Sequence, residues 1–468
     1  MRKLLLVFAI LPVLLFAQTR KQRKALEAQR KADQQVIGNL KNHTQFFTDK
    51  NAQNTVAATQ KDQQALGYIS DQFKAIGLQP KGATEYVHQY LIDDGKQIQA
   101  ATSLKVNGTL LAVKKDYFPL AFSASKRVEG MPAMALREKG VPWFADVKEW
   151  MGENVKSDSD INKIILKEAS RAASKGATAF FLYNSSNTDD NIHFNKRDKT
   201  ASVSIPVIYI TNGGYNKYFT DQSQILDIEL DVALKEATKK VNTIVGFLDN
   251  HATSNIMIAT PYDRHPADEL ETVASAGTSD DDVISGRSML IELARMLSKS
   301  KAKNNNYTFI GYSSEDSVSK DSKWLSNSSI TSNANYLINL DKVGRYDDNK
   351  SLMIAAYGVS PEVVETIKPL ADSNLEITFD SIHVSGKADF SNPVKIPVLN
   401  FFTAATTTST PVQQDNINYQ GELNIARLIY RFIEATDSKG KLAFTEKTES
   451  SIIGNNLPVS VKETVAKK

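Results

Sequence analysis

The feature that most constrains the fold is a series of apolar runs that alternate with helical segments from residue 241 onward. The runs read VNTIVGFLD, NIMIATPYD, YTFIGYSSE, YLINLDKVG, SLMIAAYG and IPVLNFFT. Strands that are apolar nearly throughout are typical of a parallel sheet covered by helices on both faces. One intervening segment, at 289–297, has the three-to-four spacing of a helix with one buried face. We therefore expect an α/β fold over residues 236–440, with a mostly parallel sheet flanked by helices.

A smaller module with a different sequence pattern precedes this domain. It consists of short apolar runs separated by polar turns, with a helical stretch at 161–174 that leads into the runs TAFFLYN and IPVIYIT. This pattern predicts an inserted α+β domain at 105–235. Residues 18–104 are expected to be a mainly helical part of the larger domain. The polar residues 441–468 are expected to form a loosely held tail.

The N-terminus has the pattern of an export signal. Arg2 and Lys3 precede an apolar run over residues 4–17. A basic start followed by a run of this length predicts a secretory signal peptide at 1–17, and the run is too short for a spanning helix. An uncleaved anchor is the alternative. After cleavage no later stretch is apolar enough to span a bilayer, so we expect a periplasmic or secreted bacterial protein.

Composition excludes several classes of function. Lys and Arg number 56 and Asp and Glu 53, and the resulting net charge of +3 is too small for nucleic-acid binding by charge neutralisation. Cysteine is absent, which excludes a thiol nucleophile and thiolate zinc ligands. No GxSxG, Walker or GxGxxG motif is present, so serine hydrolase and nucleotide-binding functions have no support.

Acidic residues gather at the predicted strand ends. Asp263, Glu315, Asp316 and Asp341 each follow an apolar run, and Asp281 precedes the amphipathic helix. Ligands of open α/β sheets bind beyond the carboxyl ends of strands. Several carboxylates at that edge indicate a bound cation or a shared proton. The alternative for each acid alone is a solvated cap or turn.

The motifs at these strand ends resemble those of the M28 family of zinc aminopeptidases. That family's usual motifs are HYDH, GADDNASG, GEE, NLDMVGR and a late YH before a DKINY-like segment. The corresponding stretches here are PYDR (261–264), SDDDVISG (279–286), SED (314–316), NLDKVGR (339–345) and TTTSTPVQQ (406–414) before DNINY (415–419). The inserted module is similar to the protease-associated (PA) domain of many members.

The resemblance implies a centre of two zinc ions that activate a shared water. By position, Asp281 matches the bridging Asp and Asp341 a terminal ligand. Asp316 stands where a ligand Glu is expected, and Glu315 where the general base is. Asp263 matches the Asp that orients the first His ligand.

The departures from the family pattern predict a degenerate metal site. Pro261 replaces the first His, and only Thr and Ser side chains at 407–410 are available for the second. Carboxylates without imidazole favour hard cations over zinc. We therefore expect no cofactor or a hard divalent cation, with zinc only if the site is intact. His265 could substitute as a ligand, whereas His383 is expected to be structural.

Two functions of different classes follow. The first is an exported pseudo-peptidase that binds peptides or a protein partner without zinc catalysis. The second is an active metallo-exopeptidase, an aminopeptidase with an atypical metal set, and the joint retention of Asp281, Glu315 and Asp341 is its best argument.

Overall fold

The structure is a computed structural model in which the chain divides into two compact units. Unit 1 comprises Met1–Tyr90 and Val241–Lys468, and unit 2 is Leu91–Lys240. The described residues are 20–48, 58–150, 158–186, 190–221, 223–263, 280–316, 322–346, 351–380, 395–403 and 417–445. The expected signal peptide, His265, His383 and the segment 406–414 lie outside them, and of Asp281 only the backbone is described.

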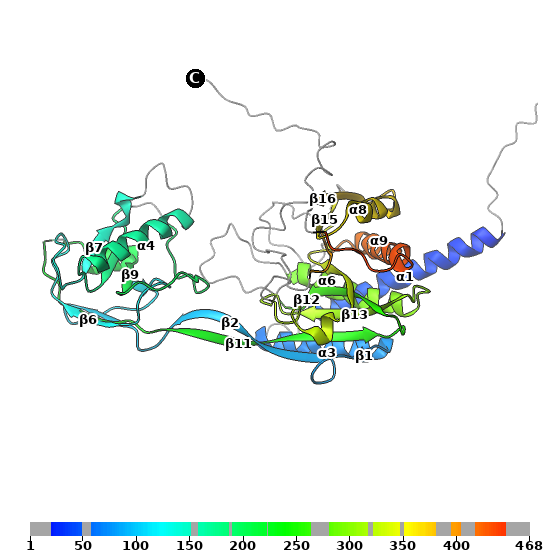
Figure 1. The fold of residues 1–468 in the computed structure, drawn as a ribbon, viewed down its shortest axis with the longest axis horizontal. Coiled ribbons are helices and arrows are strands. Elements are labelled where there is room, and N and C mark those ends of the chain that lie inside the picture. The colour runs from blue at the N-terminus through cyan, green and yellow to red at the C-terminus, as the bar shows by residue number, and fades with distance from the viewer. Residues whose placement is uncertain are drawn as a thin grey trace, which may run out of the picture. The chain divides into compact units, whose positions relative to one another are not determined.

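Unit 1 is built on a nine-stranded sheet (Figure 1). Its strand order is β1 (Gln79–Pro80), β11 (Leu234–Leu248), β13 (Asn305–Tyr312), β12 (Ser254–Pro261), β14 (Ala334–Leu340), β17 (Val398–Thr403), β15 (Ser351–Tyr357) and β16 (Glu376–Asp380), and β2 (Val87–Ile98) also pairs with β11. The central strands β13, β12, β14 and β17 are parallel neighbours. The pairs β11–β13 and β15–β17 are antiparallel. The predicted α/β fold with a mostly parallel central sheet is confirmed.

Helices cover this sheet, and alternate residues of its strands enter two cores. The larger core receives Ile256 and Ile258 of β12 together with residues of α3 (Ala58–Ile76), α6 (Asp280–Ser298) and α9 (Tyr419–Asp437). On the opposite face, Met257 and Ala259 pack in a core that contains Trp324. Among the described residues, the shorter helices of unit 1 are α7 (Ser328–Thr331), α8 (Pro361–Ile367) and the 3₁₀ turn η3 (Lys368–Leu370).

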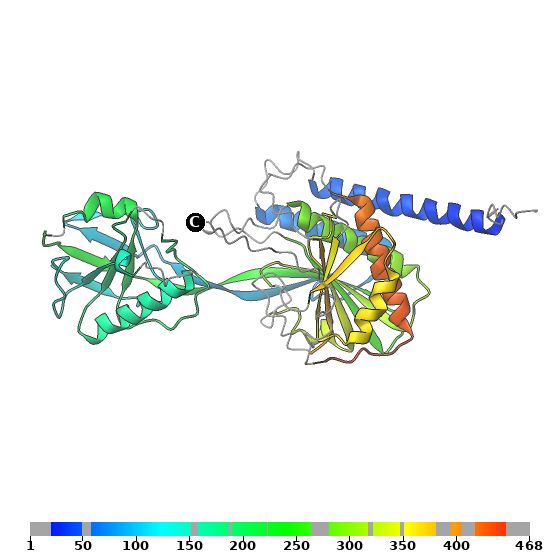
Figure 2. The same cartoon turned by 90° about the horizontal axis from the view of Figure 1, so that it is seen from above.

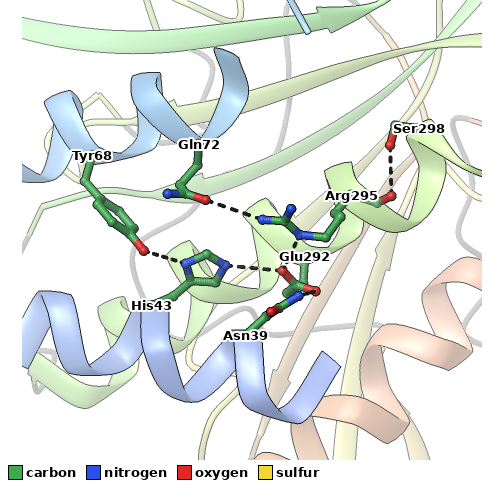
Figure 3. A network of polar contacts seen from close by, with 7 residues as sticks. All are labelled: Asn39, His43, Tyr68, Gln72, Glu292, Arg295 and Ser298. Atoms are coloured by element: carbon green, nitrogen blue, oxygen red, sulfur yellow. Dashed lines mark hydrogen bonds and ion pairs between the residues drawn. The ribbon is translucent and has the colours of Figure 1, made fainter. Parts of the chain in front are cut away.

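The first helix, α1 (Arg20–Thr48), lies beside α6 and α9 (Figure 2). A buried polar network joins it to α3 and α6 (Figure 3). Glu292 of α6 accepts hydrogen bonds from Asn39 Nδ2 (3.1 Å) and Arg295 Nε (2.9 Å) and contacts His43 Nε2 at 3.2 Å. The other ring nitrogen of His43 lies 2.8 Å from the hydroxyl of Tyr68 in α3. The Glu292 carboxylate thus joins α6 to α1, and His43 extends the network from α1 to α3.

Unit 2 contains two four-stranded sheets. One has the order β4 (Thr109–Leu110), β3 (Ser103–Val106), β10 (Ile228–Asp231) and β6 (Arg127–Gly130). The other has the order β5 (Tyr117–Pro119), β9 (Val207–Ile210), β8 (Phe180–Tyr183) and β7 (Trp143–Asp146). The helices are α4 (Asp158–Ser174), α5 (Asn212–Tyr218) and the 3₁₀ turn η1 (Val147–Glu149). This mixture is the α+β composition expected of the inserted module.

No helix in the described part of the chain combines the length and the apolar character that a membrane crossing requires.

Candidate active site

The parallel strands of unit 1 bring the acidic strand ends to one edge of the sheet. β13, β12 and β14 are neighbours, and each is followed directly by acidic residues. Asp263 follows β12, Glu315 and Asp316 follow β13, and Asp341 follows β14. The carboxyl ends of parallel strands meet at one edge, so four of the five predicted site residues share it. The fifth, Asp281, is in the first turn of α6.

Tyr312, the last residue of β13, is buried at the same edge of the sheet. Its hydroxyl donates to Asn339 Oδ1 of β14 at 3.0 Å. Burial raises the pKa of Tyr312 well above its usual value, and the nearby negative charges of Asp341, Asp263 and Asp316 raise it further. Three of the predicted acids are therefore within electrostatic reach of one phenol. Sequence reasoning missed this tyrosine because its role depends on neighbours from other strands.

The carboxylate of Asp263 holds the turn that follows β13. Its Oδ2 accepts from Ser313 Oγ at 2.6 Å, and its Oδ1 accepts from the backbone N–H of Ser314 at 2.5 Å. Burial raises the pKa of Asp263 above its usual value, and the hydrogen bonds from both serines oppose the shift. Both oxygens of this acid thus bind the segment that carries Glu315.

Asp316 is also hydrogen-bonded within the protein. Its side chain is 3% exposed, and its oxygens accept the backbone N–H groups of Lys323 (2.7 Å) and Trp324 (3.2 Å). The indole N–H of Trp324 donates to the Asp316 carbonyl at 3.1 Å. Burial raises the pKa of Asp316, and these backbone donors oppose the shift. The acid caps a turn at 322–327 whose Trp324 ring stacks on Tyr312 at 5.5 Å between centroids.

The turn that carries Asp341 is fastened to β17. The backbone N–H of Asp341 donates to the Phe401 carbonyl at 2.9 Å, and that of Thr403 donates to the Lys342 carbonyl at 3.1 Å. Lys342 has a φ of +52°, an uncommon conformation for a lysine, and two hydrogen bonds from Thr403 to its carbonyl hold it there.

Glycine allows α6 to approach this edge closely. A Cβ on Gly286 would lie 2.2 Å from Thr260 Oγ1, the hydroxyl that donates to the Leu340 carbonyl at 3.0 Å. Any larger residue would push α6 away from the ends of β12 and β14. The glycine of the SDDDVISG motif therefore serves helix–sheet packing.

Glu422 is a further acid that sequence reasoning missed. It lies in the first turn of α9, is 0% exposed, and neither of its carboxyl oxygens has a hydrogen-bond partner among the described residues. Burial raises its pKa well above the usual value. Its Oε1 lies 3.6 Å from the position that a Cβ on Gly344 would occupy, so it sits behind the NLDKVGR turn. Burial without a partner therefore favours the protonated form of this side chain.

The described residues at this edge do not fit a zinc ion. Pro261 ends β12 where a histidine ligand is expected, and it offers no side-chain donor. The carboxylate of Asp316 already accepts two backbone N–H groups. Among the residues whose side chains are described, no three of His, Cys, Asp and Glu lie close enough together to hold a metal ion.

Comparisons with known proteins agree with this fold. Residues 242–431 match the model of peptidase family M28. An aminopeptidase from Aneurinibacillus sp. strain AM-1 has a TM-score of 0.50 and 18% identity, with 87% of this chain and 96% of that chain covered. The zinc aminopeptidase BSAP from Bacillus subtilis has a TM-score of 0.48 and 16% identity, with 88% and 98% covered. A peptidase M28 precursor from Shewanella amazonensis SB2B has a TM-score of 0.43 and 13% identity, with 90% and 100% covered. No curated protein matches the sequence.

Proposed function

Because the chain belongs to peptidase family M28 through residues 242–431, we propose that it is a catalytically degenerate relative of the zinc aminopeptidases that binds peptides or a protein partner. The family implies peptide substrates and a metal cofactor. The observation that carries the proposal is the replacement of a histidine ligand by Pro261 at the end of β12. Zinc sites in proteins depend on nitrogen or sulfur ligands, and proline supplies neither.

The hydrogen bonds of the retained acids support the same proposal. The acid that should orient a histidine, Asp263, binds Ser313 and Ser314 instead. Asp316, one methylene shorter than the expected glutamate, caps the turn at 322–327. Ligand positions tolerate only about 0.2 Å of change in metal distance. Both acids therefore have a structural role in the protein that requires no metal.

An acidic edge of this kind binds the amino end of a peptide without catalysis. Glu315 and Asp341 are half-buried acids that follow β13 and β14, at the same edge of the sheet. A free α-amino group is the part of a peptide that an acidic edge attracts. We therefore expect ligands with an unblocked N-terminus to bind better than their acetylated forms.

Calorimetry on the chelator-treated full chain tests the loss of the zinc centre. We expect weak or no zinc binding, and no release of amino acids from unblocked peptides when zinc is added. Glu315→Gln is the matched variant, because it removes the general-base position while keeping the side-chain size. Tight binding of about two zinc ions, together with hydrolysis that Glu315→Gln abolishes, would overturn the proposal.

The second candidate function is an active metallo-exopeptidase with an atypical metal set. The observation that favours it is the joint retention of Asp281, Glu315 and Asp341 in the motifs that resemble the family's metal site. Oxygen ligands suit calcium, magnesium and manganese. Manganese-dependent hydrolysis would establish this function, with His265 as a further candidate ligand. Binding of a hard cation without hydrolysis would indicate a structural ion.

We further propose that the chain is exported and that unit 2 is a protease-associated type of module. The basic and apolar residues at 1–17 support export to the periplasm or the medium. N-terminal sequencing of the protein from cell fractions tests this, and a mature chain that begins near residue 18 is expected. Retention of Met1 in a cytoplasmic fraction would refute it.

A further inference from the structure

Unit 2 contains a pocket of about 460 Å³ between the C-terminal end of α4 and the loop before β7. Its inner wall is aromatic, since the lining residues Trp143 and Phe180 are 7% and 3% exposed and Trp150 is half-buried. Its mouth is cationic, because four exposed basic residues also line it: Arg137, Lys139, Arg171 and Lys175. Glu168 is the one acid among the lining residues.

The two sides of the mouth are fastened to each other. The backbone N–H of Gly140 donates to the Gly176 carbonyl at 2.9 Å, which ties the loop to the end of α4. Gly176 ends that helix with a φ of +92°, and a Cβ there would lie 2.6 Å from Lys139 Cγ. The stem of Lys139 therefore crosses directly over the helix end. The indole N–H of Trp143 donates to the Glu138 carbonyl at 2.6 Å and fixes the inner wall.

The positive charge of the mouth exceeds what local structure requires. Arg171 pairs with Glu168 at 3.3 Å, whereas no carboxylate in the described part of the chain pairs with Arg137, Lys139 or Lys175. Basic residues at a helix C-terminus interact favourably with its dipole, which accounts for Arg171 and Lys175. Arg137 and Lys139 come from the loop and gain no such interaction. These exposed cations create a positive potential at the mouth, which attracts anionic groups.

We propose that this pocket binds an acidic peptide segment, with its carboxylates at the cationic mouth and an apolar side chain against the aromatic wall. The Arg171–Glu168 pair lies within α4 and leaves Arg137, Lys139 and Lys175 to meet the carboxylates of the peptide. Arginine binds carboxylates through directed hydrogen bonds, and indole rings offer a flat apolar surface. The inference does not depend on whether unit 1 holds a metal or cleaves peptides.

Tryptophan fluorescence gives a direct measurement. The chain has three tryptophans, of which Trp143 and Trp150 line the pocket, while Trp324 is in unit 1 and is 0% exposed. The full chain is titrated with acetyl-Glu-Glu-Leu-Glu-amide, with the same peptide carrying Gln for Glu, and with tripolyphosphate. We expect a saturable change with the acidic peptide that weakens as salt rises, and none with the Gln peptide.

Paired variants locate the binding. Arg137→Gln and Lys175→Gln should each weaken the acidic peptide about ten-fold, the effect of losing one charge-assisted hydrogen bond. Lys167→Gln, an exposed basic residue of α4 outside the pocket, is the matched control and should leave affinity unchanged. Lys139→Gln replaces either variant whose circular dichroism differs from that of the original protein. Unchanged affinity in the pocket variants, or binding of tripolyphosphate without binding of the acidic peptide, would overturn the proposal.

Discussion

Replacing Glu292 by Gln should destabilise the protein strongly, because this carboxylate joins α6 to α1 and contacts the His43 ring that reaches Tyr68 of α3. It is 0% exposed and accepts from Asn39 and Arg295 while contacting His43. Removing one member of a buried ion pair costs about 3–5 kcal/mol when the other charge stays buried. Here the Arg295 side chain is 27% exposed and can regain water, so we expect about 3 kcal/mol, the lower end. Urea denaturation at pH 7 measures this difference.

The pH dependence distinguishes the lost charge from a packing defect. The pKa of Glu292 is lowered in the folded protein: burial alone would raise it, and the hydrogen bonds from His43, Arg295 and Asn39 outweigh that effect. Because the pKa of Glu292 is lower in the folded than in the unfolded protein, its ionised carboxylate stabilises the fold at pH values above the usual pKa near 4.5. This stabilisation is lost as the pH falls through the pKa of the folded protein. The difference between the two proteins should therefore be full at pH 7 and shrink below pH 4.5.

Asp71→Asn is the matched control for this experiment. It removes an exposed acid of α3 that has no hydrogen bond or ion pair among the described residues. The control should leave the unfolding free energy unchanged at both pH values. A loss below about 1 kcal/mol for Glu292→Gln, within the range of exposed pairs, would refute the reasoning. A loss that stays constant from pH 7 to pH 3 would refute it as well.

Two other substitutions test the buried acids of unit 1. Glu422→Leu should raise the free energy of unfolding by about 1–3 kcal/mol, because it removes a buried carboxyl without a partner. Burial raises the pKa of Glu422, so in the original protein the free-energy cost of burying this acid grows as the pH rises above 4.5. The gain in unfolding free energy from Glu422→Leu should therefore be larger at pH 7 than at pH 4. Asp316→Asn should cost about 1–2 kcal/mol, because one of the N–H groups of Lys323 and Trp324 loses its acceptor. Faster amide exchange at Trp324 checks this second effect, and an unchanged exchange rate would contradict it.

The sheet and its acidic edge could be predicted because both depend on local pattern and simple topology. Apolar runs separated by helices specify neighbouring parallel strands, and residues after such strands must meet at one edge. The sequence could also have indicated Glu422, which falls on the same helical face as Ile425, Ala426 and Ile429. An acidic residue on the apolar face of an amphipathic helix departs from the expected pattern and can be recognised in the sequence.

Other features depend on long-range contacts and leave no local pattern. His43 and Glu292 are 249 residues apart in the chain, and neither neighbourhood indicates the other. The strands β2 and β11 extend across the limits of unit 2 at Leu91 and Lys240. The parts of these strands that lie in unit 2 are rich in charged residues and lack the strict alternation that predicts a strand. The inserted module was therefore expected to begin later, at residue 105.

The role of Asp263 determines whether the acids retained at the strand ends indicate a metal centre. If the acid serves only to brace Ser313 and Ser314, Asp263→Asn leaves one of these donors without an acceptor and should cost about 1–3 kcal/mol. Binding of divalent cations should then stay as it is in the original protein. If the acid instead orients a metal ligand, the same variant should lose cation affinity by about 10–100-fold. A loss of cation affinity in Asp263→Asn with little loss of stability would show that the retained acids of this chain belong to a metal centre. That result would refute the proposal of a degenerate site.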